Sequence, residues 1–261
     1  LLLVRRYADA VSTDMSSVPG DTQVVAAQVP SAQRLESLAL ITGAIAFGAT
    51  AVAALIAFGY QSAPIAGHGS VGQFAALASA VVAFLSFIAG RVVVRERGRR
   101  IGVFDVLTVA SLAVAHGVIA FLTWTLLAYI MEHGFIDALV FPTPVLVLSG
   151  SAAALTAYLV FYSATHMDLL LLAVILAVFL AEGVIASMLT ASDPHWWHDN
   201  LSALGMPEDV SSLAFNLTII VSGVLVTTIA RLATRGIPDD RPHGVRNVRI
   251  CLIVVGVFLM C

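Results

Sequence analysis

Residues whose types could do chemistry gather in one stretch, residues 192–216, between two long apolar runs. Two histidines, His195 and His198, precede Asp199 there, and on an α-helix the three side chains would share one face. Two imidazoles and a carboxylate on one face can bind a divalent metal such as zinc. One hypothesis is therefore an intramembrane metal-dependent hydrolase that uses these outer-loop histidines.

The same stretch also has a mechanical interpretation. Trp196 and Trp197 belong to the residue type that anchors a chain at the membrane–water interface. Glu208 lies where the next apolar segment starts, and a carboxylate is favourable at a helix N-terminus. The stretch lacks the third clustered histidine of a zinc hydrolase, and no nucleophile-elbow pattern surrounds Ser202. We therefore expect no bound metal, no cofactor and no catalytic residue, and we favour a protein that is not an enzyme.

Two further ionisable residues, His116 and Glu182, lie near the middle of long apolar segments. Ionisable groups at this depth are costly and tend to be functional. Both lie at similar depths, so they could pair to relay protons, bind a cation or hold a headgroup, which would suit a transporter or channel component. The alternative is a polar contact that fixes helix packing. We predict that Glu182 faces other helices and reaches a polar group: His116 first, Asn216 or Thr218 second.

The elements that position these residues are membrane-spanning helices. The 261 residues are 59% hydrophobic and 11% charged, with mean hydropathy +0.97, whereas soluble domains carry roughly a quarter charged residues. A crossing needs about 20 apolar residues. The sequence therefore predicts an all-α, polytopic transmembrane helix bundle with seven apolar segments: Leu38–Gly59, Gln73–Val94, Phe104–Met131, Thr143–Thr165, Asp168–Thr190, Ser211–Thr234 and Val248–Cys261.

The domain organisation follows from these segments. Residues 1–35 are predicted to be a mostly disordered cytoplasmic tail, and residues 36–166 a four-helix N-terminal transmembrane part. Residues 167–261 would begin a second transmembrane domain with a conspicuous outer loop, 191–210. The third segment is long, and we expect it to tilt or to end early near Tyr129. The seventh is too short to span, so the chain is expected to be a fragment of a longer protein.

Orientation follows from the positive charges, all of which are arginines. They precede the first segment or lie in the loops after the second and sixth, whereas the loops after the first, third and fifth contain none. This positive-inside pattern predicts a multi-pass protein of the cell (plasma) membrane with a cytoplasmic N-terminus. A net charge of −3 argues against nucleic acid as a partner. The partners expected are membrane lipid and other membrane protein subunits.

A family resemblance rests on the same outer stretch. It carries NLSALG at 200–205, PE at 207–208 and FN at 215–216. This resembles the pattern "N-x-I-S-x-L-G … P-E … F-N" of a six-helix membrane family, the damage-regulated autophagy modulators and their uncharacterised bacterial relatives. Leu201 stands where the family has Ile, and Ala203 where Asp is frequent. The resemblance covers roughly residues 168–261.

The resemblance implies a limited function. Eukaryotic members of that family are linked to lipid handling and membrane organisation, and the bacterial branch has no assigned activity. The signature residues would then be structural or contact headgroups at the outer rim, among them Asn200, Ser202, Gly205, Glu208 and Asn216. On this basis we expect an accessory or lipid-contacting subunit of a larger membrane assembly.

Overall fold

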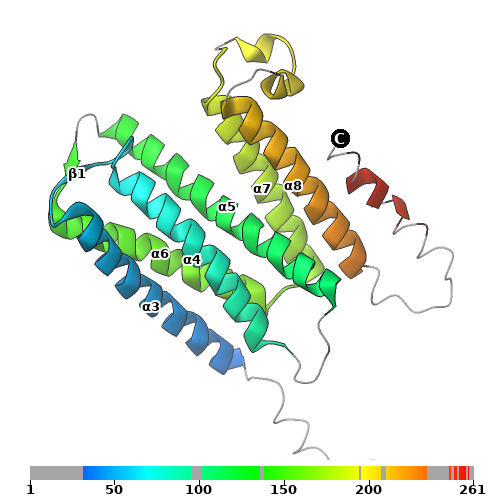
Figure 1. Cartoon of the computed structure of the whole chain (residues 1–261), viewed down its shortest axis with the longest axis horizontal. Helices are drawn as coiled ribbons and strands as arrows, with labels where there is room; N and C mark the ends of the chain where they lie inside the picture. The colour runs from blue at the N-terminus through cyan, green and yellow to red at the C-terminus, as the bar shows by residue number, and fades with distance from the viewer. Residues whose placement is uncertain are drawn as a thin grey trace, which may run out of the picture.

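The protein is a bundle of long apolar helices (Figure 1). The computed structural model describes residues 32–95, 102–135, 138–193, 195–206 and 210–233, and single positions 247, 250, 251, 253–256 and 258. Six helices are long and apolar enough to cross a membrane: α3 (Ala32–Phe58), α4 (Val71–Val93), α5 (Val103–Gly134), α6 (Pro142–Thr165), α7 (Leu169–Leu189) and α8 (Val210–Ala233). The expected all-α membrane bundle is confirmed by these six helices. Most of residues 1–35 and of the seventh segment, together with Glu208, lie outside the described residues.

The short elements mark one end of the bundle. Strand β1 (Ala63–Pro64) follows α3, and β2 (Leu139–Val140) precedes α6, and the two pair antiparallel. Two 3-10 helices, η1 (Trp196–His198) and η2 (Leu201–Gly205), connect α7 to α8. Figure 1 shows β1 and the yellow η1–η2 segment at the upper ends of the helices. We call this the outer end, as the arginine pattern predicts.

The helices pack in a defined order. Helix α3 lies against α6, α4 contacts both α5 and α6, and the α7–α8 hairpin joins the bundle through α5 (Figure 1). One buried hydrophobic cluster includes Phe87 of α4, Leu112 of α5, Phe179 of α7 and Leu225 of α8. Apolar packing is thus continuous from the four N-terminal helices into the hairpin. The division at residue 166 into two domains stays a prediction.

Small residues allow the helices to approach closely. A Cβ atom added at Gly90 of α4 would lie 2.7 Å from the Cβ of Ala164 on α6. One added at Gly43 of α3 would lie 3.1 Å from the backbone oxygen of Ala154. In lipid, association rests on van der Waals packing because the solvent is as apolar as the side chains. Glycine at these points therefore sets the interhelical distance.

Two helix boundaries differ from those predicted. Helix α3 begins at Ala32, within the expected tail, because Leu35 is buried and continues the packed face past the charged Arg34 and Glu36. Helix α5 does not end near Tyr129 but continues to Gly134. The Tyr129 ring lies 4.2 Å from the ring of His133, and the His133 Nδ1 lies 2.8 Å from the Tyr129 carbonyl oxygen. These contacts within one turn stabilise the extended end.

Candidate functional site

The intramembrane carboxyl of Glu182 lies between α7 and α5. Its Oε1 is 2.6 Å from the Oγ1 of Thr123 on α5. Its Oε2 is buried and has no hydrogen-bond partner among the described residues. The prediction that Glu182 reaches a polar group on the third segment is confirmed, although the partner is none of the three residues named in advance.

His116 links α5 to two other helices, α6 and α4. Its Nδ1 is 2.8 Å from the Leu112 carbonyl oxygen in α5, and its Nε2 is 3.0 Å from the hydroxyl of Ser163 on α6. Its ring centroid lies 4.6 Å from that of Phe87 on α4, and the residue is only 6% exposed. A carbonyl can only accept, so Nδ1–H donates to it, and Nε2 of the neutral ring accepts from Ser163. The histidine is therefore satisfied without a buried charge.

The expected pair of His116 with Glu182 is wrong. Each residue lies thirteen positions after the start of its helix, at Val103 and Leu169. Equal counts imply equal depth only if both helices start at the same level. The Thr123–Glu182 contact shows instead that α7 is displaced along the longer α5 by seven residues, or about 10 Å at 1.5 Å per residue. Glu182 therefore meets Thr123, two turns beyond His116.

The segment from residue 195 to 206, here called the outer cap, is held by its own polar side chains. The Oδ1 of Asn200 accepts hydrogen bonds from the Ser202 hydroxyl at 2.5 Å and the Ala203 amide at 3.1 Å. The Nδ2 of Asn216, on α8, donates to the Gly205 carbonyl at 3.1 Å. A Cβ at Gly205 would lie 2.8 Å from the Oδ1 of Asn216. Four residues of the family-like motif thus form two contact pairs, Asn200 with Ser202 and Gly205 with Asn216.

The predicted metal-binding face is not formed. Residues 196–198 adopt a 3-10 turn, so His195, His198 and Asp199 do not occupy one α-helical face. The His195 and His198 rings lie 5.8 Å apart, and His198 stacks on Trp197 at 3.7 Å. The described residues contain no group of three His, Cys, Asp or Glu that could hold a metal ion. The geometry therefore does not favour the hydrolase hypothesis.

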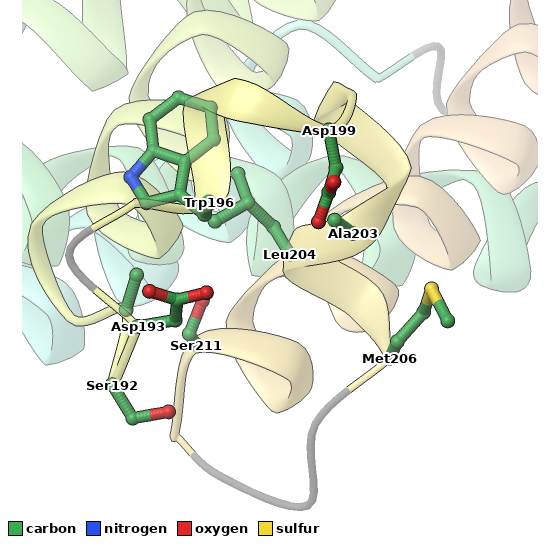
Figure 2. A pocket seen from close by; sticks show the side chains of 9 residues that line it. Ser192, Asp193, Trp196, Asp199, Ala203, Leu204, Met206 and Ser211 are labelled. Atoms are coloured by element: carbon green, nitrogen blue, oxygen red, sulfur yellow. The ribbon is translucent and has the colours of Figure 1, made fainter.

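A small pocket lies under the outer cap. Figure 2 shows Asp193 and Asp199 on either side of Leu204 in this view, and the open volume is about 190 Å³. Ligand pockets typically measure about 300–1,000 Å³. Below the cap, the Ser187 and Ser211 hydroxyls each donate to the other residue's carbonyl, at 3.0 and 2.9 Å, and so join α7 to α8.

Comparison with known proteins finds no match of any kind: no family model, no curated protein and no solved structure matches the chain.

Three hydroxyl groups that bond polar groups on other helices were not predicted from the sequence. Thr123, Ser163 and Ser187 each bond a polar group on another helix. Thr123 lies seven residues after His116, which places both on the same side of α5. That spacing places Thr123 on the helix face of His116 but does not determine which of the two meets Glu182. The sequence had no signal for the other two, because serine and threonine are frequent in these apolar helices.

Proposed function

We propose that this integral membrane protein is a lipid-contacting accessory component of a membrane assembly, and that its outer cap meets the headgroup region. The proposal rests on a difference between the polar and the apolar side chains at the cap. Polar Asn200 and Asn216 are engaged in hydrogen bonds that hold the cap. Apolar Trp197, Leu201 and Met206 are 61%, 45% and 79% exposed. Exposed tryptophan and aliphatic side chains beside a membrane helix favour the interface.

The described side chains fit an accessory role better than an enzymatic one. The described residues hold no metal cluster, and the pocket under the cap is small. The polar groups in the membrane bond one another across helices, as at His116 and Ser163.

We further propose kinship with the damage-regulated autophagy modulator-like family. Its support is that motif residues bond one another: Asn200 accepts from Ser202, and Asn216 on α8 donates to the Gly205 carbonyl.

Lipid contact of the cap is testable by fluorescence. A variant with Trp197 as its sole tryptophan (Trp124→Phe, Trp196→Phe) should be quenched in vesicles of brominated phosphatidylcholine. Quenching should be stronger with bromines near the headgroup end of the acyl chain than with bromines near its terminus, because an interfacial indole lies at headgroup level. The control retains only Trp124, whose Nε1 donates to Thr156 within the bundle, and should favour the deeper bromines. Quenching of Trp197 by aqueous acrylamide and by neither lipid would contradict the proposal.

We also propose that the N-terminus faces the cytoplasm in the plasma membrane. In a background with Cys251→Ser and Cys261→Ser, Ser62→Cys next to β1 should react with a membrane-impermeant maleimide added to intact cells. Gly102→Cys, at the start of α5, should react only after permeabilisation, because positive-inside charges place that end in the cytoplasm. Mass spectrometry of the labelled protein measures both. Labelling of Gly102→Cys in intact cells would reverse the orientation.

A further inference from the structure

Three oxygen atoms form a short row at the α5–α7 contact. The Thr123 Oγ1 lies 2.8 Å from the Ile119 carbonyl oxygen and 2.6 Å from the Glu182 Oε1. A carbonyl oxygen can only accept, and a hydroxyl has a single proton to donate. Two oxygen–oxygen contacts this short need two protons. With an ionised Glu182, one of the two contacts would have no proton between its oxygens.

We propose that Glu182 is a membrane-embedded proton-binding site and carries its proton as a neutral carboxylic acid at pH 7. Thr123 then donates its hydroxyl proton to the Ile119 carbonyl, as threonines in helices commonly do. The carboxylic O–H of Glu182 donates to the Thr123 Oγ1. Each short contact then has one proton. This site is distinct from the outer cap and goes beyond lipid contact.

The second carboxyl oxygen supports the same protonation state. Oε2 is buried without a hydrogen-bond partner within the described part of the chain. An unpaired neutral polar oxygen is costly to bury, and an unpaired charge is far more costly. An ionised carboxylate would place negative charge on this unpaired atom. The acid form leaves only a carbonyl-type oxygen there.

Within the part of the chain that the structure describes, Glu182 makes no ion pair with a basic side chain. Helix α7 has no other titratable residue, and α8 has only Arg231, near its inner end. On α5 the titratable residues nearest to Thr123 are Tyr129, which is not basic, and His116, six and seven residues away, or about 9 and 10 Å along the axis. Both nitrogens of that histidine are already engaged. Asp105, Tyr129, Glu132 and His133 lie nearer the ends of α5.

Infrared spectroscopy of the protein in phosphatidylcholine vesicles at pH 7 tests the site. The difference spectrum of wild type minus Glu182→Gln should show the C=O stretching band of a carboxylic acid, which the variant lacks. Glu132→Gln, at the exposed outer end of α5, should leave this acid band in place. Thr123→Val should raise the frequency of the acid band, because the O–H loses its acceptor. Thr42→Val should not, although Thr42 makes the same bond to a carbonyl, at 2.7 Å from Leu38.

The outcomes are decisive in either direction. Loss of a carboxylate band in Glu182→Gln would overturn the proposal and show Thr123 donating to an anion. An acid band of unchanged frequency in Thr123→Val would overturn the assignment of the Thr123 Oγ1 as the acceptor of the carboxylic proton. Neither result bears on the fluorescence of Trp197, so failure here is separable from failure of the lipid-contact proposal.

Discussion

Gly183→Ala is expected to destabilise the protein by about 2 kcal/mol or more, as overpacking of a tight contact does. A Cβ at Gly183 of α7 would lie 2.2 Å from the Oγ1 and 2.3 Å from the Cγ2 of Thr218 on α8. Thr218 cannot easily rotate away, because its hydroxyl donates to the Ala214 carbonyl at 2.7 Å and its branched Cβ restricts χ1. The α7–α8 hairpin must therefore separate. Unfolding of the purified protein by heat or by sodium dodecyl sulfate measures the loss.

Two variants control for the cause. Gly48→Ala, in the middle of α3, meets no atom within 4 Å and should be neutral or more stable by up to about 1 kcal/mol, the gain of alanine over glycine in a helix. Adding Thr218→Ala to Gly183→Ala removes the two closest atoms and should recover part of the stability. A Gly183→Ala protein as stable as wild type would show that the two helices are not this close.

His116→Ala is the second substitution with a large expected effect, a loss of about 2–4 kcal/mol for a buried large-to-small change. The deletion removes the ring that packs on Phe87 and leaves the Ser163 hydroxyl without its partner on α5. His116→Phe keeps the ring volume and should lose less, about 1 kcal/mol, the share of the hydrogen bond. The same unfolding measurement separates the two contributions.

His133→Ala provides a matched control. His133 makes the same contact to the carbonyl four residues earlier, at 2.8 Å, but is exposed at the end of α5. Surface substitutions usually change stability by no more than about 0.5 kcal/mol. Equal losses at His116 and His133 would contradict a structural role of the His116–Ser163 link.

Part of the structure of the outer cap follows from contacts between residues that are close in the sequence. Asn200 accepts from residues two and three positions later, a local contact that asparagine favours before a helical turn. The interaction of Asn216 with Gly205 spans eleven residues and depends on the α7–α8 hairpin. The alternative of a metal-binding face failed because it assumed an α-helix, whereas residues 196–198 form a 3-10 turn.

The six membrane helices were determined by the sequence itself, because a bilayer-spanning segment satisfies its backbone hydrogen bonds internally and needs only length and apolarity. That is why the described spans agree with the apolar runs to within a few residues at most ends. The partner of Glu182 was decided by tertiary structure alone. It depends on the axial displacement of α7 along α5, which sets Glu182 beside Thr123 and leaves His116 to Ser163. That displacement results from packing between helices, and no pattern within one helix encodes it.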